Sequence, residues 1–108
     1  MPQYAELAIG DEIAHRTGGM EQYQMIFGGA IPGEDGRFGV QVGLYKAAGY
    51  GGMGASFTWN VGEGDRIRLG QGYKVYEDPD RKKRASRVEA ITFHKIEVDC
   101  VTVSYDWI

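Results

Sequence analysis

Cysteine and histidine are the residues of this chain best suited to nucleophilic catalysis, and both are scarce. The chain has one cysteine, Cys100, and two histidines, His15 and His94. A tight turn centred on Glu97 would place His94 opposite Cys100 across a hairpin, where an imidazole can activate a thiolate. The segment 96–98 contains no turn-forming residue, and a lone cysteine usually behaves as a small apolar side chain. The pattern therefore favours a structural role for Cys100, and we expect no catalytic residue here.

Metal binding and acid–base chemistry receive little more support. The two histidines lie far apart and have no ligand spacing, so we expect no metal and no cofactor. Strand alternation could instead point four side chains into an apolar interior, where they could act on a hydrophobic substrate; these are His15, Tyr23, Tyr73 and Tyr105. Buried tyrosines are more often core residues whose hydroxyl reaches the rim. An enzyme is therefore the less favoured interpretation.

The strongest candidate for a binding site is a glycine-rich segment. Glycine makes up 17 of the 108 residues, and its densest run spans 49–54. Glycine allows positive φ and close backbone approach, while aromatic and methionine side chains make adaptable contacts. We expect this loop and its flanks to recognise a protein or a small apolar ligand; the alternative, equally supported, is a plain surface loop whose aromatic side chains fold back onto the core. The candidate contact residues are Tyr45, Tyr50, Met53, Phe57 and Trp59.

A basic loop is the second candidate surface. It contains Arg81, Lys82, Lys83, Arg84 and Arg87, whereas the whole chain carries a net charge of −3. Such a loop could contact phosphates, because neutralising a phosphate releases counterions. Proteins that bind single-stranded nucleic acid usually interleave aromatic side chains with their basic residues, and this loop has no aromatic residue. We therefore do not expect nucleic acid as a partner, and a solvated hairpin tip is the more usual meaning.

The elements that must position these residues are predicted to be β-strands. Apolar side chains recur at every second position, and helical periodicity is almost absent. Pro32–Gly36 is the strongest turn signal, so a hairpin is expected around it. The sequence therefore predicts eight or nine short antiparallel strands that form a small barrel or a flattened sandwich. The expected core is Leu7, Ile9, Phe27, Phe38, Val40, Val42, Leu44, Phe57, Trp59, Val61, Ile67, Val75, Val101, Val103 and Trp107.

Two irregularities refine this prediction. Val88 and Ala90 share one face of a strand while Ile91 and Phe93 lie on the other, so either a bulge or a strand covered on both faces is expected near Ala90. The motif Gly-Asp-x-Ile occurs at Gly10 and again at Gly64. The chain is thus expected to be one domain, 1–108, with a possible duplication of half-barrels 1–54 and 55–108.

Length and composition limit the functional classes. No apolar run is long enough to cross a bilayer, and no signal peptide is visible at the start, so we expect a cytoplasmic protein that does not enter a membrane. The favoured function is a non-enzymatic binding module, which could act as a homodimer. The alternatives are a small β-barrel isomerase or cyclase with an apolar substrate in its lumen, and phosphate contact through 81–87.

Overall fold

The computed structural model describes residues 3–18, 21–46, 54–77 and 84–108, and these residues form strands joined by turns without a helix. The nine strands are β1 (Ala5–Ala8), β2 (Glu12–Gly18), β3 (Glu21–Pro32), β4 (Arg37–Lys46), β5 (Gly54–Gly62), β6 (Arg66–Arg68), β7 (Tyr73–Tyr76), β8 (Ala85–Ile96) and β9 (Cys100–Trp107). The predicted all-β fold and number of strands are therefore confirmed.

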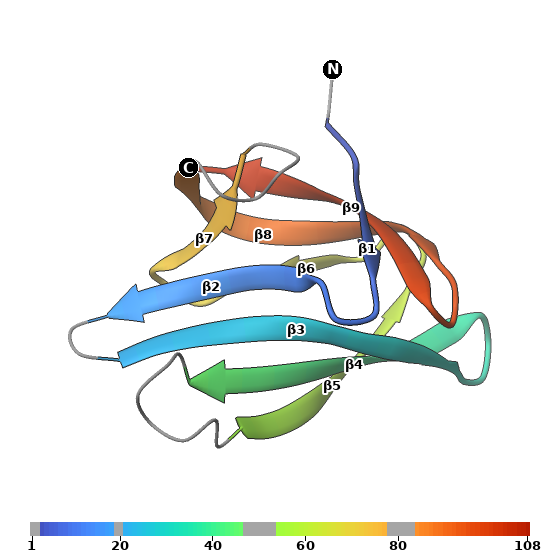
Figure 1. The fold of residues 1–108 in the computed structure, drawn as a ribbon. Coiled ribbons are helices and arrows are strands. Elements are labelled where there is room, and N and C mark those ends of the chain that lie inside the picture. Colours follow the sequence, from blue (N-terminus) through green and yellow to red (C-terminus); the bar gives the residue numbers. More distant parts are fainter. Residues whose placement is uncertain (1–2, 19–20, 47–53, 78–83) are drawn as a thin grey trace.

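All nine strands belong to one antiparallel sheet. Its order is β1-β9-β8-β7-β2-β3-β4-β5, and β6 pairs with β8 beyond the end of β7. Strands β1 and β5 are the two ends of the sheet and do not pair with each other. The sheet is therefore open, and the expected closed barrel is not formed. The sheet bends so that β8 and β9 face β3 and β4 across the interior (Figure 1).

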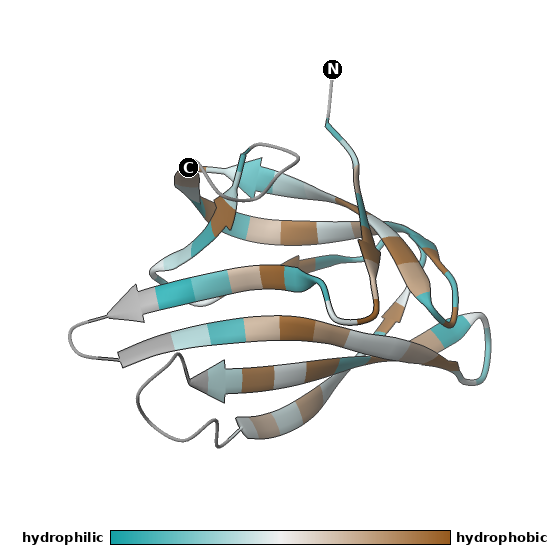
Figure 2. Ribbon diagram, in the orientation of Figure 1, coloured by the Kyte–Doolittle hydropathy of each residue, from teal (hydrophilic) through white to brown (hydrophobic). Residues whose placement is uncertain are grey.

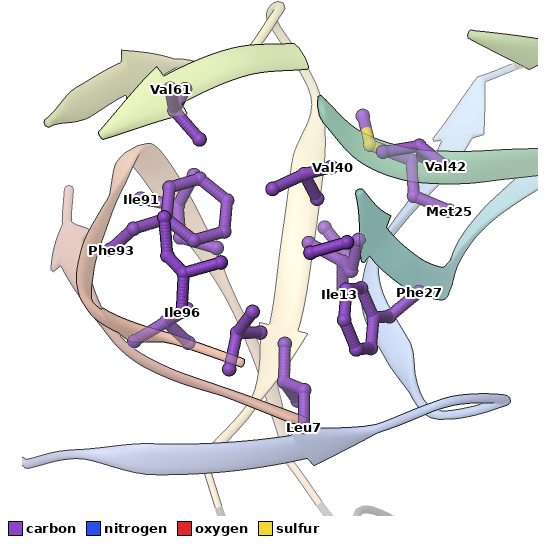
Figure 3. Close-up of a cluster of buried hydrophobic side chains, with 14 of the residues drawn as sticks. Leu7, Ile13, Met25, Phe27, Val40, Val42, Val61, Ile91, Phe93 and Ile96 are labelled. Carbon is purple, nitrogen blue, oxygen red and sulfur yellow. The ribbon is translucent and has the colours of Figure 1, made fainter. Parts of the chain in front are cut away.

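The space between the two parts of the sheet is filled by apolar side chains. Brown and teal alternate along the strands because successive residues point to opposite faces (Figure 2). Figure 3 shows Phe27 of β3 and Phe93 of β8, both fully buried, within this cluster. Eight residues of the expected core are buried, namely Leu7, Phe27, Val40, Val42, Val61, Val75, Val101 and Val103, and five more pack against it, namely Phe38, Leu44, Phe57, Trp59 and Ile67.

For two residues the prediction of a core position is wrong. Ile9 is 56% exposed because β1 ends at Ala8 and Ile9 belongs to the following turn, where alternation no longer applies. Trp107 is 41% exposed because it lies at the end of β9. The structure adds residues that were not expected in the core, namely Ile13, Ala14, Met25, Ala30, Val88, Ala90, Ile91, Phe93 and Ile96.

Bulges explain several of these additions. The register of β8 against β9 shifts between Val88 and Ala90, and both Ala90 and Ile91 are completely buried. The bulge expected from the broken alternation is therefore confirmed. A second bulge lies in β2, where the register against β3 shifts between Glu12 and Ala14. There Ile13 and Ala14 are both buried, since the extra residue lets two successive side chains face the same side.

The β3–β4 hairpin also follows the prediction. Its central residues, Asp35 and Gly36, both have positive φ, at 57° and 73°. The Arg37 N–H donates to the Glu34 carbonyl at 3.1 Å, which closes a two-residue turn of the type that matches the twist of a hairpin. This turn fixes the register of β3 against β4, and thereby decides which residues of β4 face outward.

The two halves of the chain share a pairing pattern except for β7, which pairs with β8 and β2 and has no counterpart in the first half. In the first half β3 pairs with β2 and β4, and β4 also pairs with β5. In the second half β8 pairs with β6 and β9, and β9 also pairs with β1. Each half therefore contributes an end strand to the other half. A duplication of the chain stays a prediction, for which this likeness is a reason.

Candidate functional site

Tyr45 is the most distinctive of the candidate binding residues that the structure describes. It faces outward near the end of β4, directly opposite Gly54 of β5, and is 44% exposed. A Cβ at position 43 would lie 2.7 Å from the Tyr45 Cε2, and one at position 54 would lie 2.9 Å from its Cδ1. The ring therefore lies close over two glycines and fills the space that their side chains would take, as aromatic rings do beside glycine in sheets. This contact leaves the rest of the ring open to solvent.

The other candidate contact residues are not gathered around Tyr45. Phe57 and Trp59 lie opposite Val42 and Val40 and pack against the core. Their rings are 5.5 Å apart in an edge-to-face arrangement, and Trp59 also contacts Phe93 with centroids 6.0 Å apart. They are thus on the inner face of β5, while Tyr45 is on the outer face. Tyr50 and Met53 lie outside the described residues.

Uncharged polar side chains continue from Tyr45 along the outer face. Because Val40, Val42 and Val61 point inward, the alternate residues of β4 and β5 point outward. Register pairs Gly43 with Ser56, Gln41 with Thr58 and Gly39 with Asn60. Over the described outer positions from Gly39 to Tyr45 and from Gly54 to Asn60, no side chain is charged. The outer face therefore offers hydroxyl and carboxamide groups beside one aromatic ring.

A groove lies at the far end of this row. Its volume is about 590 Å³, and Ile31, Pro32 and Phe38 provide its apolar contacts. Gln41, Thr58 and Asn60 line the same groove with polar atoms, and the turn residues Glu34 and Asp35 contribute to it as well. Ile31 is 60% exposed, which is high for such a large apolar side chain. Open apolar contacts with a few convergent polar groups are typical of ligand sites.

Arg37 is fixed at the edge of this groove. Its Nη2 donates to the Asn60 carbonyl at 2.7 Å, and its Nε donates to the Asn60 Oδ1 at 3.2 Å. The same Nη2 lies 3.4 Å from the Asp65 carboxylate. The guanidinium is therefore held by neutral and acidic groups, and its charge is balanced within the protein.

Sequence reasoning did not select the groove residues Ile31, Gln41, Thr58 and Asn60. The signal that could have identified them is the alternation itself, since it fixed the inner residues of β4 and β5 and hence the outer ones. The outer residues are neutral, although a solvated sheet face usually carries charges. The neutral outer residues of β4 and β5 are thus already visible as an unusual stretch in the sequence.

The basic loop is described only at its C-terminal end. Arg84 Nε lies 3.3 Å from Glu77 Oε2, so its charge has an acidic neighbour across the loop. Arg87 is exposed on β8 opposite Lys74. Arg81, Lys82 and Lys83 lie outside the described residues, so phosphate contact by this loop stays a prediction.

His94 and Cys100 do not form the pair that a turn centred on Glu97 would have produced. The turn spans Glu97–Asp99 rather than centring on Glu97, since the Glu97 N–H donates to the Cys100 carbonyl at 2.8 Å. Cys100 then lies opposite Ala8 of β1. His94 instead has its Nε2 2.6 Å from the Ser104 Oγ, and its ring contacts the Tyr4 ring edge-on at 4.7 Å. Burial raises the pKa of the Cys100 thiol, and nearby carboxylates add to the effect.

His15 was expected to point into the interior, but it lies on the outer face. Its Nδ1 lies 2.6 Å from the Glu12 Oε1, because the bulge at Ile13 places both side chains on the outer face. Gln24 donates to the other oxygen of Glu12 at 2.9 Å, and the Tyr76 ring lies 4.9 Å from the imidazole.

The three tyrosines that were candidates for the interior site also lie in separate parts of the sheet. Tyr105 donates from its hydroxyl to the Ile13 carbonyl at 2.6 Å, and Tyr73 packs against the core. Tyr23 lies opposite Lys46 and Arg16 and is partly buried. These side chains therefore do not converge on an interior cavity.

Within the described part of the chain, no group of three or more His, Cys, Asp or Glu side chains could hold a metal ion. Among the same residues, no helix has the length and apolar character needed to cross a membrane. Comparisons with protein-family models, curated proteins and solved structures find no match to this chain.

Proposed function

We propose that this protein is a non-enzymatic binding module that recognises its ligand with the outer face of β3, β4 and β5. The observation that carries this proposal is the placement of Tyr45, whose ring lies over Gly43 and Gly54 and is 44% exposed. An exposed aromatic ring held by a rigid strand loses little conformational entropy on binding. Tyr45 also lies shortly before the glycine-rich segment in the sequence.

The composition of the interior supports a binding function over lumenal catalysis. Among the described residues, no buried side chain is polar or charged. An isomerase or cyclase that holds its substrate inside the sheet would need polar groups there to move protons. The groups suited to that role, including His15, lie on the outer face or bond to the backbone.

Native mass spectrometry of gently purified protein tests this function. We expect the wild-type protein from its own host to carry a non-covalent adduct, whose mass distinguishes a small ligand from a second copy. Tyr45→Ala should lose the adduct, because the exposed ring provides contact area. The control is Tyr4→Ala, which removes another exposed tyrosine, located before β1.

Two results would contradict the proposal. One is an adduct that Tyr45→Ala retains as fully as the control variant. The other is a bare wild-type protein whose Tyr45 is nitrated equally fast in host extract and in buffer, since a bound ligand would protect the ring.

A further inference from the structure

We infer that the ligand of the outer face is a neutral oligosaccharide, an inference that rests on the binding function proposed above. The surface concerned, called here the outer-face track, runs from Tyr45 to the groove and comprises Tyr45, Gln41, Ser56, Thr58, Asn60 and Ile31. Three features of the outer-face track select this class of ligand: its flat ring, its free polar atoms and its lack of net charge.

The Tyr45 ring provides a platform for a sugar ring. In β-linked glucose, xylose and N-acetylglucosamine the axial substituents of the ring are hydrogens, so the sugar can pack its C–H groups on the flat face of an aromatic side chain. The short approaches to positions 43 and 54 show that the Tyr45 ring lies along the sheet surface. A ring that lies along the sheet offers its face, whereas one standing upright would offer mainly its edge. Among the described residues the phenol hydroxyl has no hydrogen-bond partner, so it can bond with a ligand as well.

Polar atoms farther along the outer-face track, toward the groove, have unused hydrogen-bonding capacity. The carboxamide of Gln41 has one long internal hydrogen bond, from its Nε2 to the Gly39 carbonyl at 3.4 Å. Asn60 uses its Oδ1 for Arg37, which leaves its Nδ2 as a donor. Thr58 has no side-chain partner in the described part of the chain and is exposed. Sugar hydroxyls both donate and accept, so they can satisfy this mixture of donors and acceptors.

The charges around the outer-face track argue against anionic ligands. Arg37 is held by Asp65 and Asn60, so it does not offer an unbalanced positive charge. Glu34 and Asp35 line the groove and would repel phosphate or sulfate. A purely apolar ligand is disfavoured for another reason: it would desolvate Gln41, Thr58 and Asn60 without replacing their hydrogen bonds to water.

The length of the outer-face track indicates a chain of sugars rather than a single one. Gln41 is four residues from Tyr45 on the same strand, which is about 14 Å at the usual rise of an antiparallel strand. A single monosaccharide cannot contact both the ring and the groove. A short oligosaccharide lying along β4 can contact both.

Titration of the labelled protein followed by amide NMR tests the inference. The probes are neutral β-linked hexasaccharides of glucose, xylose and N-acetylglucosamine, with a sulfated polysaccharide and a mixture of unstructured peptides as comparisons. We expect at least one neutral hexasaccharide to shift the resonances of residues 39–45 and 54–60. The corresponding monosaccharides should bind much more weakly, since they reach only one end of the outer-face track.

Four variants localise the contacts. Tyr45→Ala should weaken hexasaccharide binding by about tenfold or more, the loss typical of a central aromatic contact. Tyr45→Phe keeps the platform and should retain most of the affinity. Thr58→Val keeps the shape of the side chain and should weaken binding by a smaller factor, while Tyr4→Ala should have no effect. The amide spectrum of each free variant shows whether its fold is intact.

The results separate this inference from the proposed function. If the peptides shift the same resonances and no neutral sugar does, the oligosaccharide inference is wrong and the binding module stands. If only the sulfated polysaccharide shifts resonances, near Arg84 and Arg87, the outer-face track is not the site and both proposals fail. A hexasaccharide affinity unchanged in Tyr45→Ala would also overturn the inference.

Discussion

Asp11 and Asp65 hold two separate turns of the chain with the same hydrogen bonds. Asp11 Oδ2 accepts from the Ala8 N–H at 2.9 Å, and Asp65 Oδ2 accepts from the Gly62 N–H at 2.8 Å. In each turn the residue before the aspartate is a glycine with positive φ, at 98° and 93°. Each turn also exchanges two backbone hydrogen bonds with a phenylalanine of a long strand, Phe27 or Phe93. The repeated motif in the sequence thus has a repeated structural role.

Replacing either aspartate with alanine should destabilise the protein by about 1 kcal/mol, because a backbone N–H loses its partner. Asp65→Ala should cost somewhat more than Asp11→Ala, since it also releases Arg37. Asp99→Ala, in the turn between β8 and β9, is the control. Urea unfolding measures the three changes, and equal midpoints for wild type and both turn variants would contradict the role of these carboxylates.

Ile13 and Ile9 provide a direct test of the core boundary. Ile13→Ala removes a side chain that is 1% exposed, and should lower the free energy of unfolding by about 2–5 kcal/mol through lost burial and a residual cavity. Ile9→Ala removes one that is 56% exposed, and should change it by less than about 1 kcal/mol. Thermal or urea unfolding compares the two variants. A larger effect at position 9 would restore the assignment made from alternation alone.

The Tyr105 hydroxyl is expected to stabilise the bulge in β2. Tyr105→Phe leaves the Ile13 carbonyl without this donor and should cost about 1 kcal/mol. Hydrogen exchange should also quicken locally in β2, because the bulge loses its link to β9. Tyr4→Phe removes an exposed hydroxyl from a ring 59% exposed, and serves as the control. An equal loss of stability in both variants would argue against a specific contact.

Gly43 and Gly54 should respond differently to alanine. At position 43 the nearest atoms belong to the Tyr45 ring, which can rotate away, so Gly43→Ala should change stability little and leave Tyr45 more exposed. At position 54 a Cβ would also lie 2.9 Å from the Leu44 carbonyl oxygen, so Gly54→Ala should destabilise the β4–β5 pair.

Two measurements follow both glycine variants. Tyr45 nitration reports the exposure of the ring, and urea unfolding reports stability. Gly62→Ala, where nothing lies closer than 3.7 Å, is the control. Nitration of Tyr45 at the wild-type rate in Gly43→Ala would show that the ring does not depend on the glycine below it.

Cys100 should be a slow nucleophile at mildly alkaline pH. Partial burial raises the pKa of the thiol, and Glu6, Glu97 and Asp99 act in the same direction because they disfavour a nearby thiolate. The reactive thiolate therefore forms only at higher pH than in an unfolded chain. We expect the pH profile of iodoacetamide labelling to move upward in the folded protein relative to the same protein in urea. Coincident profiles would contradict this environment.

Local pattern was sufficient to predict the fold class. The alternation in β4 and β5 identified their inner residues, and the Asp35–Gly36 pair fell inside the expected hairpin turn. Alternation failed where a strand ends or gains a residue. Ile9 lies past the end of β1, and the bulge at Ile13 reverses the facing of His15. Both errors arise because the period of two holds only along an unbroken strand.

The sequence by itself determined that this chain forms antiparallel strands, since turn chemistry and alternation depend on neighbouring residues. It also determined that two aromatic residues, Tyr45 and Trp59, flank the glycine-rich segment. Only the tertiary structure decided that Tyr45 faces outward over Gly43 and Gly54 while Trp59 packs inside. It also decided that β9 pairs with β1 and that β5 is left at an end of the sheet. Pairing joins residues that are distant in sequence, so it depends on how both sheet halves bury one common core.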